Sequence, residues 1–133
     1  MASVEAAIVA ALKANAGVSA LAGTRVFIEG AQQGGTYPFV TVQRISTPTA
    51  SHLNGASNLD WPRIQIDAWS QVALEALNTS EAIRSALDCI EINISGVIFT
   101  ATFQDQRGPA PDESTKNFNV SQDYFAWHKR TTP

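Results

Sequence analysis

WPRIQIDAWS, residues 61–70, is the stretch on which the interpretation of the fold depends, because its side chains alternate in character. The apolar positions are Ile64, Ile66 and Ala68, and the positions between and around them are Arg63, Gln65, Asp67 and Trp69. A period of two is typical of a β-strand with one buried and one exposed face, and the proline at its start is tolerated there. The stretch therefore predicts a strand with an apolar inner face and a polar, aromatic outer face.

The charged residues of this strand could also belong to a site of chemistry. Arg63 and Asp67 share one face, but four residues at ~3.3 Å each place them roughly 13 Å apart. They cannot meet unaided, so cross-strand pairing with Arg44 or Thr41 is the simpler expectation. We expect these side chains to line a surface rather than to form a catalytic cluster.

The rest of the chain supplies further strands, two helical segments and long polar connections. Apolar residues at helical spacing begin at Val4 and end near Gly17, with one more helical turn over 18–23, and a second helix is expected over 71–90. The other predicted strands cover 25–28, 38–46, 97–103 and 117–128, and the connections cover 29–36, 47–60 and 104–115. The order α-β-β-β-α-β-β shows no repeated strand–helix–strand unit. It predicts a single α+β domain, 1–133, with a mainly antiparallel sheet of about five strands and two helices packed on one face.

Three local features complete this prediction. Ser70 is expected to cap the helix over 71–90, and Cys89 is expected to be a small core residue at its end. The alternation of the last strand slips between Val120 and Tyr124, which indicates a bulge.

Composition excludes several functional classes. The chain has 133 residues and a net charge of −3, whereas nucleic-acid-binding domains usually carry a basic patch. One cysteine allows no disulfide within the chain. No apolar run is long enough to cross a membrane, and no signal-peptide pattern is present, so we expect a reducing cytoplasm.

No constellation of catalytic or metal-binding residues emerges. The two histidines, His52 and His128, fit no metal-binding or nucleophilic motif. The acidic residues Asp105, Asp112 and Glu113 lie in a hydrophilic stretch where carboxylates are normally solvated. The residues themselves therefore provide no clear candidate for a catalytic, metal-binding or cofactor-binding site.

Several stretches together resemble a known family. They are LKANAGVSALAGTRVF, then YPFVTVQRIS, then a polar loop, then WPRIQIDAWS, then LEALNTSEAIRSAL. This succession, over about residues 1–90, resembles the tail-completion or tail-terminator proteins of long-tailed bacteriophages and related phage-like particles.

The resemblance implies a structural virion protein at the head–tail junction, assembled in the host cytoplasm. It also implies no enzyme activity, and we accordingly expect no catalytic residue, no metal and no cofactor. The subunits form a homo-hexameric ring that caps the finished tail tube and stops tube polymerisation. The partners implied are other copies of the chain, the tail tube protein and the head-completion (connector or stopper) protein. DNA passes through the channel without sequence-specific binding, and no membrane is involved.

Candidate contact residues follow from the long connections and the outer face of the strand at 61–70. His52, Leu53 and Arg107 are expected to meet neighbouring proteins. Arg63, Asp67 and Trp69 are expected to meet adjacent subunits, because arginine and aromatic residues are enriched at protein interfaces.

Other functions remain open at this point. The chain could be another head–tail connector, a minor tail component, or a cellular homo-oligomeric scaffold. A small-ligand-binding or enzymatic α+β domain is an alternative of a different class, and it would require a closed pocket with convergent polar groups.

Overall fold

The computed structural model describes residues 4–28, 37–46, 49–52, 55–94, 96–111 and 117–129. The helices of this part of the chain are α1 (Val4–Ala14), α2 (Ala16–Ala22) and α3 (Ala73–Leu87). The strands are β1 (Val26–Ile28), β2 (Phe39–Ser46), β3 (Thr49–His52), β4 (Gly55–Asp60), β5 (Arg63–Ser70), β6 (Glu91–Ile94), β7 (Val97–Pro111) and β8 (Phe118–Lys129). The predicted α+β class is confirmed, whereas the predicted numbers of strands and helices are too low.

The described strands form one eight-stranded sheet with β8 near its centre. β8 pairs with β7, with β5 and, near its end, with β4, while β2 pairs with the far side of β5. These pairings, together with β3–β4 and β6–β7, are antiparallel. The pairing of β1 with β2 is parallel, so the sheet is mixed.

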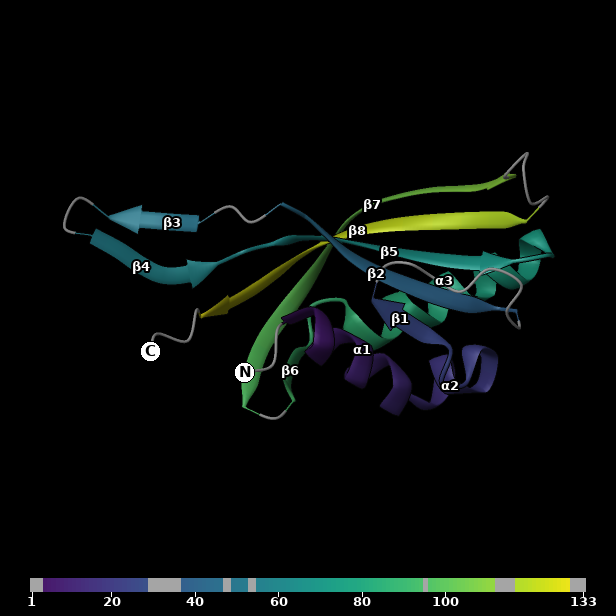
Figure 1. Ribbon diagram of the computed structural model, residues 1–133, viewed down its shortest axis with the longest axis horizontal. Helices are drawn as coiled ribbons and strands as arrows, with labels where there is room; N and C mark the ends of the chain where they lie inside the picture. Colours follow the sequence, from purple (N-terminus) through teal and green to yellow (C-terminus); the bar gives the residue numbers. More distant parts are fainter. Residues whose placement is uncertain are drawn as a thin grey trace.

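The helices lie on one face of the sheet, as Figure 1 shows. We call this covered side the inner face and the opposite side the outer face. The alternation predicted for 61–70 is confirmed, because Ile64, Ile66 and Ala68 are fully buried in the main apolar cluster together with residues of the helices. Three helices pack here rather than two, because the expected extra turn is a separate helix. Asn15 begins it by accepting a hydrogen bond from the Val18 N–H at 3.1 Å.

The connection predicted over 47–60 contains the hairpin β3–β4, which corrects the sequence interpretation. In Figure 1 this hairpin projects beyond the helices, and we call it the arm. The polar stretch after 103 also differs from the prediction, because β7 continues as a strand to Pro111. β6 was not predicted. The arm and the polar part of β7 lack the apolar alternation of a strand with a core face, so sequence pattern alone does not identify them. β6 does alternate, with Ile92 and Ile94 packed against the core, but it is only four residues long.

The slip in the last strand has a different cause from the one predicted. The described pairing of β8 with β5 runs without a register shift, so the predicted bulge in β8 is wrong. Gln122 occupies an inner position, where it donates a 2.9 Å hydrogen bond to the Ser80 carbonyl oxygen of α3. The register shifts instead lie between β7 and β8. At one of them Gly108 has φ 100°, and a Cβ there would lie 2.4 Å from the Asn119 carbonyl oxygen.

Two predictions at the ends of α3 are also corrected. Val72 is the N-cap residue, and Ser70 instead accepts a hydrogen bond from the Val72 N–H at 3.2 Å. Cys89 is exposed rather than buried. It follows the end of the helix in a turn with φ 59°, so it is no longer on the buried stripe of α3.

Candidate protein interface

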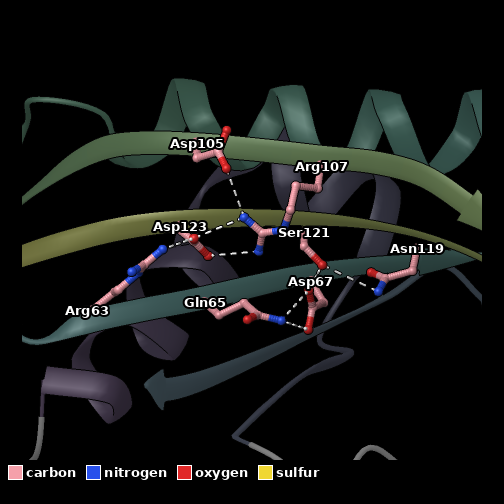
Figure 2. A network of polar contacts seen from close by, with 8 residues as sticks. All are labelled: Arg63, Gln65, Asp67, Asp105, Arg107, Asn119, Ser121 and Asp123. Atoms are coloured by element: carbon pink, nitrogen blue, oxygen red, sulfur yellow. Dashed lines mark hydrogen bonds and ion pairs between the residues drawn. The ribbon is translucent and has the colours of Figure 1, made fainter. Parts of the chain in front are cut away.

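The outer face is built from the alternate positions of four neighbouring strands. Asp67 of β5 lies opposite Thr41 of β2 and Ser121 of β8, and Ser121 lies opposite Arg107 of β7. Polar side chains that are far apart in the sequence are therefore neighbours across the strands. Figure 2 shows the network that they form.

Asp123 of β8 is the centre of this network. Its carboxylate accepts hydrogen bonds from Arg63 Nη2 at 2.7 Å and from Arg107 Nη1 and Nη2 at 3.0 and 3.1 Å. Arg107 also donates to Asp105 at 3.0 Å. The Asp123 side chain is 3% exposed, whereas those of Arg63 and Arg107 are 46% and 49% exposed. One buried carboxylate thus fixes two half-exposed guanidinium groups on the outer face (Figure 2).

The titration of Asp123 reflects these partners. Burial alone would raise the pKa of Asp123, but the hydrogen bonds and positive charges of Arg107 and Arg63 outweigh burial and lower it. The hydrogen bond to Asp123 is also the main reason that the pKa of Arg107 is raised. The cluster is therefore ionised at neutral pH, with its charges paired inside the chain.

Asp67 of β5 has a different environment from Asp123, although β5 pairs directly with β8. It is 6% exposed and accepts hydrogen bonds from the Ser121 hydroxyl and from Gln65 Nε2. Burial raises the pKa of Asp67, and these neutral donors only partly oppose the rise. Arg63 and Asp67 therefore have separate partners, as predicted from their spacing.

The two carboxylates do not form a catalytic pair in a pocket. Both oxygens of Asp123 are bonded to arginine. A hollow of about 490 Å³ lies elsewhere, beside α3, and is lined by Glu81, Arg84, Ser85 and Asp88. In the described ranges, His, Cys, Asp and Glu do not gather into a group of three or more that could hold a metal ion. This arrangement suits protein contact better than acid–base chemistry.

Aromatic side chains flank the polar network at both ends. Trp61, Phe125 and Trp127 form a group that we call the arm-side aromatic cluster, with ring centroids 5.0 Å apart for Trp61–Trp127 and 6.4 Å for Phe125–Trp127. Trp127 is 38% exposed. At the other end Trp69 stacks on Phe39 at 5.9 Å. Large aromatic groups beside paired charges are typical of interfaces.

The predicted contact residues are only partly brought together. Arg63, Asp67, Trp69 and Arg107 share the outer face, and Arg107 lies in β7 rather than in a loop. Trp69 Nε1 donates to Thr41 Oγ1 at 3.1 Å, which holds this ring against β2.

The remaining contact predictions have other outcomes. His52 ends β3, while Leu53 and the loop over 29–36 lie outside the described residues. Arg44 does not join the outer face as a partner of Asp67, because it pairs with Glu5 of α1 on the inner side.

Asp123 and Ser121 were missed as site residues. The signal was present in SQDYFAWH, where polar residues and then aromatic residues occupy the positions that alternate with Gln122, Tyr124 and Ala126. That pattern gives their face but not their partners. The partners come from strands whose register is not encoded locally.

The described helices were compared with the length and hydropathy that a membrane span requires. Among the described residues no helix is long and apolar enough to span a membrane, and α1 with α2 reaches that limit only as a pair bent by 84°.

Comparison with known proteins gives the class and then the family. The class is that of structural proteins of phage-type tails. The chain belongs to the tail completion protein gp17 family, whose model matches residues 6–129. Among solved structures, a chain of the virion of a native gene transfer agent particle has a TM-score of 0.78 at 19% identity, covering 94% of this chain and 93% of that one. No individual curated protein matches this chain.

Proposed function

We propose that this chain forms a ring that caps the completed tail tube, stops its polymerisation and provides the joint to the head. Membership of a tail completion family is the observation that carries the proposal. The fold shared with a virion chain of a phage-like particle supports it.

The ring is proposed to be a homo-hexamer located at the head–tail junction of the virion and assembled in the host cytoplasm. A ring uses two different surfaces of each subunit in a contact that closes on itself. The outer face, with Arg63, Asp67 and Trp69, is the proposed subunit contact. Arg107, His52 and Leu53 are proposed to meet neighbouring proteins, which include adjacent copies of the chain, the tail tube protein and the head-completion protein.

The channel is proposed to let DNA pass without binding it tightly. Tight binding requires free arginine or lysine side chains that release counterions from phosphates. The net charge of the chain is −3, and Arg63 and Arg107 are already paired with Asp123 and Asp105, which leaves fewer cationic groups for phosphates. A lumen lined by unpaired arginines in an assembled ring would contradict this part of the proposal.

The proposed role is structural, without catalysis. The buried carboxylates Asp67 and Asp123 lie on a sheet face with their oxygens engaged, and the hollow beside α3 contains neither of them. Asp88, which lines that hollow, has a pKa lowered mainly by the hydrogen bond that it accepts from the Phe103 N–H. The chain is proposed to need no cofactor and no membrane.

Tube polymerisation in vitro tests the function directly. The purified chain is added to polymerising tail tube protein, tube lengths are measured by electron microscopy, and ring size is measured by native mass spectrometry. Short, capped tubes and a ring are the expected results. Unchanged tube lengths together with binding to a head-side connector would favour a connector role instead. A monomer that binds neither protein would contradict the proposal.

A further inference from the structure

The arm, β3 with β4, receives little support from its own chain. Within the described residues β3 pairs only with β4, and β4 pairs with β8 only at Leu59–Lys129 and Asp60–His128. Figure 1 shows the arm extending past the helices, so the layer that covers the inner face of the sheet does not reach it. An isolated two-stranded hairpin is marginally stable in water. The arm is therefore an element that contact with another molecule would stabilise.

An exposed aromatic group continues the same surface at the base of the arm. Trp61 directly follows β4, and Trp127 directly precedes the β8 residues that pair with it. Trp127 donates a hydrogen bond from Nε1 to Thr102 Oγ1 at 3.2 Å, which fixes the ring in place while 38% of the residue stays exposed. Fixed aromatic side chains bind with little loss of conformational entropy.

The number of residues in the arm and the arm-side aromatic cluster suits part of a stable interface. A standard interface uses about 20–30 residues from each partner. The four residues of β3, the six of β4 and the three of the arm-side aromatic cluster supply about half of one side. The neighbouring charges of Arg63 and Arg107 are already paired with Asp123, so covering these two arginines leaves neither of them without a counter-charge.

A possible receiving surface lies at the opposite end of the same chain. β5 runs for eight residues, about 26 Å, from the base of the arm to the start of α3. There Val72 and Leu74 are 56% and 65% exposed. A projecting element at one end and exposed apolar side chains at the other are what a head-to-tail contact between identical subunits requires.

We propose that the arm of one copy docks on a second copy of this chain, at the α3 end that carries Val72 and Leu74. The inference rests on the proposed ring, and it adds the arm and the start of α3 to the outer face as surfaces through which adjacent subunits meet. The arm reaches out from one subunit, and the start of α3 in the next subunit receives it.

Cross-linking between two differently labelled copies tests this assignment. In a Cys89→Ser background, one batch of full-length chain carries Ala56→Cys in β4 and a second batch carries Leu74→Cys. The two are mixed and treated with a short bismaleimide, so a cross-linked heterodimer can form only between copies. Glu91→Cys, an exposed position in β6, replaces Leu74→Cys in the matched control. The expected yield with Leu74→Cys exceeds the control by at least about tenfold.

Leu74→Glu provides a second measurement that does not depend on a cross-linker. Because Leu74 is 65% exposed, the variant should keep the wild-type melting temperature while its oligomer fraction, measured by native mass spectrometry, falls at least about tenfold. The docking assignment is overturned if the wild type forms a ring but Glu91→Cys cross-links as well as Leu74→Cys, or if the Leu74→Glu variant still forms the ring. Either result leaves the proposed ring function unaffected. A wild-type chain that stays monomeric, even with tail tube protein present, overturns both.

Discussion

The two faces of the same strands differ in what their residues contact. On the inner face of β5, Ile64 and Ile66 are no more than 1% exposed and pack against the helices. On the outer face of the same strand, Arg63 and Asp67 bind side chains of β8, while the described helices lie on the opposite face of the sheet (Figure 1). The inner face thus supplies most of the free energy of folding, and the outer face arranges groups for contact with other molecules. Substitutions should separate these two roles.

The largest effect on stability is expected on the inner face. Phe99 of β7 is 1% exposed, and Phe99→Ala removes its apolar contacts and leaves a cavity. We expect the free energy of unfolding to fall by about 3–5 kcal/mol, measured by urea denaturation. Assembly should fail only because folded chain is lost. A loss below about 1 kcal/mol would show that the inner face does not hold the fold together as described.

Asp123→Asn should have the next largest effect, because Asp123 is the outer-face residue with the most charged partners. The variant removes the anion that holds two arginines, and both arginines can regain water because they are half-exposed. We expect a loss of about 2 kcal/mol at neutral pH. Asp105→Asn is the matched control, since Asp105 is 59% exposed and its loss should cost less than about 0.5 kcal/mol.

The loss of unfolding free energy caused by Asp123→Asn should become smaller as pH falls. The pKa of Asp123 is lowered from 3.8 in the folded chain, so its stabilisation is present above 3.8 and disappears as pH falls through the lower folded value. Unfolding of the wild type and Asp123→Asn should therefore converge in acid. A difference that persists unchanged at the lowest pH would mean that the carboxylate charge is not the cause.

A third substitution should affect assembly more than stability. Trp127→Ala removes a partly exposed indole side chain that contacts Trp61 and Phe125. The free energy of unfolding should fall by about 1 kcal/mol, while the subunits should no longer assemble into a ring. Ile98→Ala, at a position on β7 that is 51% exposed, serves as the control and should leave assembly intact. Equal assembly by both variants would remove the arm-side aromatic cluster from the interface.

The smallest effect is expected at Asp67. Because burial raises the pKa of Asp67, the stability from its protonated form is present below 3.8 and is lost as pH rises through the folded value. Asp67→Asn cannot ionise, so its stability relative to the wild type should increase over this rise, by less than about 1 kcal/mol. Urea denaturation at several pH values measures the trend. A relative decrease instead would show that ionised Asp67 is a stabilising acceptor.

The sequence was sufficient to predict the part of the fold with a core face. The alternation in 61–70 correctly identified β5 and its buried side, because apolar burial forces a period of two. The arm was missed because TASHLNGASNLD has no apolar face to alternate with. Gln122 produced a wrong prediction of a bulge, since a buried amide bonded to α3 looks the same in sequence as a shift in register.

The candidate site was only half predictable for a related reason. Arg63, Asp67 and Trp69 could be assigned to one face from spacing alone. The partners of Arg63 could not be assigned, because Asp123 is sixty residues away and reaches it through the pairing of β5 with β8. Local sequence gives the face of a strand, whereas long-range register decides which charges meet.

Electron microscopy of particles from a strain lacking this gene tests the central claim most directly. The strain is complemented with no copy, with the wild type, or with Trp127→Ala. The account predicts overlong or unjoined tails beside DNA-filled heads without the gene, rescue by the wild type, and no rescue by the folded variant. Normal joined particles in the strain that lacks the gene would contradict the proposed role in tail completion.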